Sequence, residues 1–116
     1  MNGLPAILAQ RRDATYSELD IAVRADNPWF EGHFPGQPIL PGVVQIGWAV
    51  HFACALHGSS PEVRTLEQIK FRRPILPGAE LCLRLTPQPD TGKLRFEYRD
   101  AAGSFSSGTL VFGTAP

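Results

Sequence analysis

The segment GHFPGQPILPGV, residues 32–43, contains His33, the residue whose type and setting are best suited to chemistry. Histidine titrates near neutral pH, so a histidine held in place can accept or donate a proton under ordinary conditions. The prolines of this segment restrict its backbone and favour a fixed position for His33. Alternatively, His33 is a loop histidine that is simply hydrogen bonded to backbone.

A helical pattern follows this loop. Residues 42–56 contain neither proline nor internal turn chemistry. Apolar side chains recur there at helical spacing, at Val43, Val44, Ile46, Val50, Ala53, Cys54 and Leu56. His57 and Gly58 supply the expected end of the helix. Because polar positions are few, we expect this helix to be wrapped on most sides.

The rest of the sequence is typical of strands. Leu19, Ile21 and Val23 alternate with polar or small residues and predict a first strand over residues 15–23. Four prolines and three glycines in residues 26–42 exclude a regular element there but not an ordered loop. Further strands are predicted at residues 63–73, 79–86, 93–99 and 104–112, separated by turns. The pattern predicts one α+β domain over residues 1–116.

Composition narrows the class of protein. The 116 residues include eleven basic and eleven acidic side chains, so no long-range field favours nucleic acid or an anionic membrane. Cys54 and Cys82 lie in apolar contexts and are expected to be buried thiols in a reducing compartment. No apolar stretch approaches the roughly 20 residues of a membrane span. We expect a cytoplasmic protein without a metal site or cofactor.

Two motifs carry a family resemblance. Residues 32–43 resemble the active-site segment of bacterial β-hydroxyacyl-acyl carrier protein dehydratases, and IKFRRPILPGAEL at 69–81 resembles their later strand and turn. With the helix between them, these motifs cover about half the chain in the family's order. The resemblance implies a hot-dog fold, a curved antiparallel sheet wrapped around one long central helix. LPGVVQ followed by Trp48 looks closer to the aryl polyene branch than to the housekeeping enzyme.

The resemblance also implies an activity. Such a hydro-lyase removes water from a 3-hydroxyacyl thioester, linked to acyl carrier protein or coenzyme A, and yields a trans-2-enoyl thioester in fatty acid or specialised lipid biosynthesis. His33 matches the catalytic base, and Gly42 matches the glycine whose amide binds the thioester carbonyl. A helix N-terminus suits that role, because its unpaired N–H groups and dipole favour a developing enolate oxygen. The implied substrate-binding residues are Phe34, Gly36, Pro41 and Val43.

One expected residue is missing. The family places a Glu or Asp on the central helix, contributed across a dimer interface, which helps to expel the 3-hydroxyl. Fourteen residues after His33 this sequence has Gly47, and residues 32–60 contain no acidic side chain. Glycine inside a helix costs on the order of 1 kcal/mol relative to alanine, so stability does not explain Gly47. We expect Gly47 to make room for close packing of a neighbouring element or for a wider acyl pocket.

We expect a homodimer or a heterodimer with a homologous subunit, and three explanations for the missing acid stay open. Gln45, His51 or an ordered water replaces it; a homologous subunit supplies it; or the protein, alone or as a partner subunit, binds or hydrolyses acyl thioesters without dehydrating them. Arg72 and Arg73 are candidates for contact with phosphopantetheine or with an acidic carrier protein. Alternatively, they form a solvated strand end before Pro74.

Overall fold

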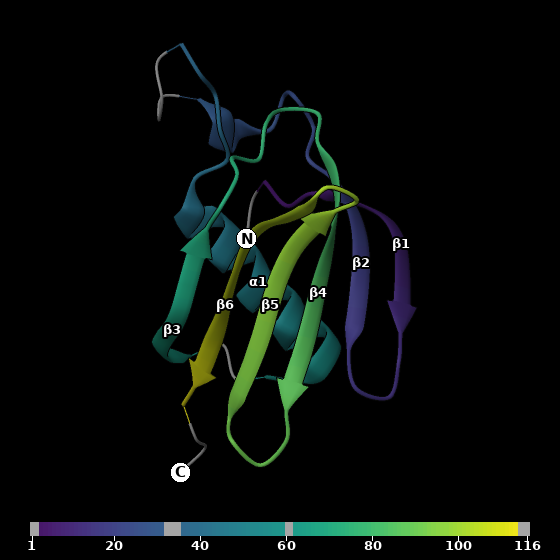
Figure 1. The fold of residues 1–116 in the computed structure, drawn as a ribbon, viewed down its shortest axis with the longest axis vertical. Helices are drawn as coiled ribbons and strands as arrows, with labels where there is room; N and C mark the ends of the chain where they lie inside the picture. Colours follow the sequence, from purple (N-terminus) through teal and green to yellow (C-terminus); the bar gives the residue numbers. More distant parts are fainter. Residues whose placement is uncertain (1–2, 32–35, 60–61, 114–116) are drawn as a thin grey trace.

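The computed structural model describes residues 3–31, 36–59 and 62–113 of the chain. The elements are β1 (Ala6–Arg12), β2 (Ser17–Ala22), the short 3-10 helix η1 (Pro28–Phe30), α1 (Gly42–His57), β3 (Val63–Phe71), β4 (Glu80–Gln88), β5 (Lys93–Asp100) and β6 (Gly103–Phe112). Figure 1 shows α1 lying across one face of the sheet. This arrangement confirms the predicted α+β fold. Within these ranges, no helix combines the length and hydropathy needed to span a bilayer.

The strands form one sheet in the order β1-β2-β4-β5-β6-β3, and each neighbouring pair is antiparallel. Alternate side chains of the central strands point toward α1 and are buried, as the period-two pattern predicts. They include Leu81, Leu83 and Leu85 of β4 and Leu94, Phe96 and Tyr98 of β5. At one edge, β3 pairs with β6, and this register sets Phe71 opposite Ser106.

Helix α1 agrees closely with its predicted bounds. It ends at Gly58, whose φ of 64° is left-handed and whose amide donates to the carbonyls of Ala53 and Cys54. The face toward the sheet is buried and consists of Val44, Gln45, Trp48, Ala49, Phe52 and Ala53. The other face is exposed or half-buried and consists of Val43, Ile46, Gly47, Val50, His51 and Cys54. The expectation that the helix is wrapped on most sides is therefore wrong for the single chain, because the sheet covers one face.

Two local predictions also need correction. Strand β1 was not predicted, and the predicted first strand is the second in the sheet; all seven residues of β1 are exposed, so its sequence lacks the alternation of a half-buried strand. Residues 26–42 do contain a regular element, because η1 forms over Pro28–Phe30. The Asn27 side chain accepts a hydrogen bond from the Trp29 amide at its start, and proline occupies its first turn.

Candidate active site

Helix α1 begins at a turn made by Leu40 and Pro41. The Pro41 carbonyl accepts hydrogen bonds from the amides of Val44, at 3.1 Å, and Gln45, at 3.2 Å. The amides that precede these in the chain cannot pair within the helix, and they point away from it. The start of α1 is therefore the positive end of the helix dipole, and it can bind an oxygen that gains negative charge.

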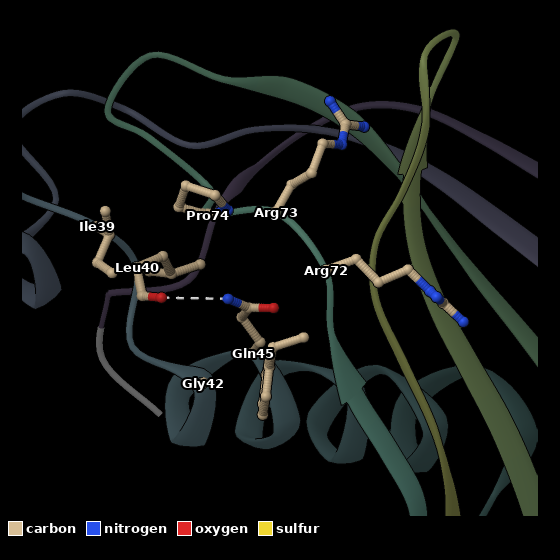
Figure 2. Close-up of a pocket in the computed structure, with 8 residues that line it drawn as sticks. Ile39, Leu40, Gly42, Gln45, Arg72, Arg73 and Pro74 are labelled. Carbon is tan, nitrogen blue, oxygen red and sulfur yellow. Dashed lines mark hydrogen bonds between the residues drawn. The ribbon is translucent and has the colours of Figure 1, made fainter.

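A cavity of about 320 Å³ opens beside this end of α1 (Figure 2). Its lining comes from the turn before the helix, the first helical turn, and the segment that leaves β3. The lining residues are Ile39, Leu40, Gly42, Gln45, Phe71, Arg72, Arg73 and Pro74. The fold thus brings residues of the first motif, within 39–42, and residues of the second motif, within 71–74, to one cavity.

Gly42 lies directly under the aromatic ring of Phe71. A Cβ atom added to Gly42 would come within 2.6 Å of Cζ and 2.9 Å of Cε1 of that ring, closer than real Cβ contacts. Residue 42 must therefore be glycine for Phe71 to keep this position. The ring is half exposed, so it forms part of the cavity wall and not of the core.

Gln45 is buried on the sheet side of α1, with 3% of its surface exposed. Its Nε2 donates to the Leu40 carbonyl at 3.1 Å, as Figure 2 shows. Its Oε1 accepts a hydrogen bond from Ser106 Oγ at 2.6 Å, and its main-chain carbonyl accepts one from Tyr98 Oη at 2.7 Å. Complete burial raises the pKa of Tyr98 well above its usual value, so this phenol stays a donor.

Gly47 and His51 lie on the other side of α1 from Gln45. They share the half-exposed face with Val43, whose side chain is 74% exposed. The His51 ring contacts Phe52 edge to face, with centroids 5.1 Å apart. The structure thus brings Gly42 and Gln45 together at the cavity but turns Gly47 and His51 toward the face that the single chain leaves open.

The structure describes two of the remaining sequence-predicted residues and omits two others. Pro41 is buried at the helix start, and Gly36 is exposed with a left-handed φ of 84°. His33 and Phe34 lie outside the described residues. Nearby in the chain, Phe30 belongs to the core, and the Trp29 ring lies against Gly3.

Arg72 and Arg73 have different surroundings. The Arg73 guanidinium donates to Asp100 Oδ1 at 2.6 Å and to the Gly103 carbonyl at 2.8 Å, and it stacks 3.9 Å from the centre of the Phe105 ring. The Arg72 side chain is exposed at the cavity and leaves the main chain in another direction (Figure 2). Arg73 is therefore largely structural, whereas Arg72 remains available to an anionic group.

The cavity provides hydrogen-bond donors and apolar walls but no proton acceptor among its described residues. The ionisable residues in its lining are two arginines. His57 lies at the far end of α1, where burial and the positive charge of Arg12 lower its pKa. Within the described ranges, no group of three or more His, Cys, Asp or Glu side chains could hold a metal ion. The described site can therefore bind a carbonyl oxygen, and a group that moves protons must come from elsewhere.

Sequence reasoning did not single out three residues of this site. Phe71 lies within the second motif, so that motif was the available signal. Tyr98 and Ser106 are 53 and 61 positions from Gln45 in sequence, and an ordinary strand pattern surrounds both. Their link to the helix depends on strand order and register, which local sequence does not encode.

Comparison with known proteins assigns the family. Residues 9–109 match the model of the ApeI-like family, described as ApeI dehydratase. The chain belongs to the ApeI-like dehydratase family. In this ApeI-like protein, the matched region includes both motifs, the whole of α1 and most of the sheet.

Several individual proteins are similar to the ApeI-like chain. It is 41% identical, over an alignment of 72 residues, to the 3-hydroxyacyl-[acyl-carrier-protein] dehydratase FabZ of Geobacter metallireducens. The match covers 54% of this chain and 48% of the relative. The chain thus spans about half the length of such curated relatives.

Two solved structures that are more than 30% identical to this chain cover nearly all of it. A chain of the dehydratase heterocomplex ApeI:P from Xenorhabdus doucetiae is similar at 31% identity and a TM-score of 0.85, covering 95% of this chain and 98% of its own. A protein from Erwinia carotovora subsp. atroseptica is similar at 36% identity and a TM-score of 0.80, covering 95% and 96%. The chain therefore has the hot-dog fold, like the similar chain of the dehydratase heterocomplex.

Proposed function

We propose that this chain is the histidine-bearing subunit of a 3-hydroxyacyl thioester dehydratase. Its substrate is linked to acyl carrier protein or coenzyme A, and its product is a trans-2-enoyl thioester. The observation that carries the proposal is the cavity at the start of α1, which Gly42 lines. The chain that contains this cavity belongs to a dehydratase family. The FabZ relatives, which are 3-hydroxyacyl-[acyl-carrier-protein] dehydratases by name, support this substrate class.

In the proposed reaction, His33 removes the proton from C2 of the thioester. The carbonyl oxygen then gains negative charge, which the Gly42 amide and the helix dipole stabilise. The electron pair forms the C2–C3 double bond as the C3–O bond breaks. An acid donates a proton to the departing hydroxyl, which leaves as water. The substrate thus loses one proton to His33 and gains one from the acid.

The acid of this reaction is proposed to come from a homologous subunit. The face of α1 that holds Gly47 is apolar and half-exposed, which suits contact with a second subunit. The similar Xenorhabdus protein is part of a dehydratase heterocomplex, which supports an unlike partner. Within the chain, Gln45 is a poor replacement, because a carboxamide has no ionisable proton and this one is hydrogen bonded at both ends. His51, one helical turn beyond Gly47, is the alternative within the chain.

The test is incubation of the purified protein with 3-hydroxyacyl carrier-protein thioesters, alone and mixed with a carboxylate-bearing homologue. Mass detection separates loss of water from loss of the acyl group. Gly47→Glu should raise dehydration by the chain alone on the order of a hundredfold, because a positioned acid contributes about that much. Gly47→Gln, which has nearly the same shape but no acid, is the matched control.

His33→Ala should lower dehydration by about two to four orders of magnitude.

Other outcomes favour other functions. Loss of rate in His51→Ala, with no gain from Gly47→Glu, would assign the acid to His51. Release of the acyl group without loss of water would indicate a thioesterase. If the folded protein bound acyl thioesters and no combination released water, the dehydratase proposal would be wrong and a non-catalytic binding subunit would remain.

A further inference from the structure

Three buried polar side chains connect the first turn of α1 to the middle of the sheet. Gln45 is 3% exposed, and Tyr98 and Ser106 are fully buried. Ser106 Oγ donates to Gln45 Oε1, while Tyr98 Oη donates to the Gln45 carbonyl. We call these three residues the Gln45 network.

Filling a core with the polar side chains of the Gln45 network costs more desolvation free energy than filling it with apolar side chains. A buried amide or hydroxyl is costly unless it is hydrogen bonded, and apolar residues of the same shape can serve stability as well. A fully bonded network instead fixes one geometry, because every alternative arrangement leaves a buried group unpaired. Its position next to the candidate carbonyl site therefore matters more than its contribution to stability.

What the network fixes is the turn that leads into α1. The Leu40 carbonyl accepts from Gln45 Nε2 at 3.1 Å, and the Leu40 amide donates to the Ile75 carbonyl at 2.9 Å. Both main-chain groups of Leu40 are thus held, one by the helix and one by the chain beyond β3. Pro41 follows with φ at −59°, a torsion that its ring restricts.

The next peptide group joins Pro41 to Gly42, and its N–H is the proposed carbonyl donor. Its C=O accepts from the amides of Val44 and Gln45, inside the helix. Because C=O and N–H point in opposite directions in a trans peptide, the Gly42 N–H points out of the helix start. Its direction therefore depends on the turn that Gln45 holds.

We propose that Gln45, itself held by Ser106, is a positioning residue that aims the Gly42 amide at the thioester carbonyl. This inference rests on the proposed function, and it gives Gln45 a role other than that of the missing acid. The network lies on the side of α1 away from Gly47, so it can act whichever subunit supplies the acid.

The test is the infrared stretch of a bound thioester carbonyl. The probe is a saturated acyl-pantetheine thioester labelled with carbon-13 at the carbonyl, which cannot be dehydrated. Binding to the native protein should lower the stretching frequency, because the Gly42 amide hydrogen bonds to the oxygen. Ser106→Ala and Gln45→Met should each lose at least half of this shift. Ser107→Ala is the matched control, since Ser107 is the neighbouring buried serine with its side chain on the opposite face of β6.

Turnover provides a second measurement. Ser106→Ala should lower kcat about tenfold while KM stays within about twofold, since the lost interaction strengthens as the oxygen gains charge. A shift that persists in both Ser106→Ala and Gln45→Met would overturn the inference alone. If the native protein binds the probe without any shift, Gly42 does not bind the carbonyl, and the proposed function falls together with the inference.

Discussion

At the scale of single residues, the contact between Gly42 and Phe71 joins two distant parts of the chain. The glycine belongs to the first turn of α1, and the phenylalanine is the last residue of β3. The missing Cβ lets the ring lie on the helix start, and the ring in turn closes one side of the cavity. The pair therefore sets the shape of the cavity while both residues contribute little to the core.

This contact makes the effect of Gly42→Ala depend on Phe71. Alanine should gain up to about 1 kcal/mol of helix stability, but its Cβ must displace the ring, so the net change in the native protein should be near zero. In a Phe71→Ala background, the same substitution should stabilise by up to about 1 kcal/mol. Urea unfolding of the four proteins measures this coupling. Equal effects of Gly42→Ala in both backgrounds would show that the ring imposes no restriction.

Cys82 is predicted to be an unreactive thiol. Burial, followed by the negative charge of Glu18, raises its pKa to about 11. Only the thiolate is nucleophilic, so at pH 8 the ionised fraction falls from roughly a tenth, for an ordinary pKa of 9.0, to about 0.1% in the folded chain. Alkylation by iodoacetamide should therefore be about a hundredfold slower in the folded protein than in urea, and it should accelerate above about pH 10. Peptide mass spectrometry measures the alkylation of each cysteine separately. Similar rates for Cys82 in the folded and the unfolded protein would contradict the raised pKa.

At the scale of elements, the segment after β3 contains two neighbouring arginines with different expected roles: Arg73 stabilises the fold, and Arg72 contacts the substrate. Arg73→Ala should lower the free energy of unfolding by about 1–2 kcal/mol, because it removes a partly exposed ion pair and a cation–π contact. Arg72→Ala should change it by less than about 0.5 kcal/mol and should raise KM for a carrier-linked substrate. Denaturant unfolding and steady-state kinetics measure the two effects. A larger loss of stability in Arg72→Ala than in Arg73→Ala would reverse the assignment.

Most elements could be predicted from local sequence, because burial on one face leaves a period in the chain. The α1 pattern and the alternation in β4 and β5 are of this kind. Strand β1 leaves no such period, since both of its faces are exposed. The short helix η1 depends on the Asn27 cap within a proline-rich loop, which composition alone does not reveal.

The candidate site was less predictable than the fold. The motif at residues 32–43 indicated Gly42 and its position at a helix start, and the structure places Gly42 at a cavity. The role of Gln45 depends on Ser106 and Tyr98, which reach it through the pairing of β5 with β6. Contacts of this kind require the sheet order, and no single stretch of sequence contains that information.

At the scale of the whole molecule, the open face of α1 predicts an oligomer. Val43, Ile46 and Val50 leave apolar surface exposed or half-exposed on a helix that otherwise packs on the sheet. A second subunit, alike or homologous, would cover that surface. We therefore expect a dimer at micromolar concentration.

Val50→Glu should dissociate this dimer, because it would bury a charge without a partner in the interface. Ala55→Glu is the control, since Ala55 is an exposed residue on the same helix outside that apolar set. Light scattering at several concentrations gives the mass of each variant. A native protein that stays monomeric, both alone and with a homologous subunit, would contradict the expected dimer.

The exposure of β1 predicts which strand of the sheet detaches first in local unfolding. This strand lies at one edge and pairs only with β2, and each of its residues is exposed. It is tied down by the ion pairs of Arg11 with Glu18 and Asp20, and by a hydrogen bond from Arg12 to the Leu56 carbonyl. Detaching it exposes little apolar surface, so its amides should exchange with deuterium long before those of β4 and β5, which open only when the core does. The β1 edge of the sheet should therefore open before the central strands β4 and β5 do.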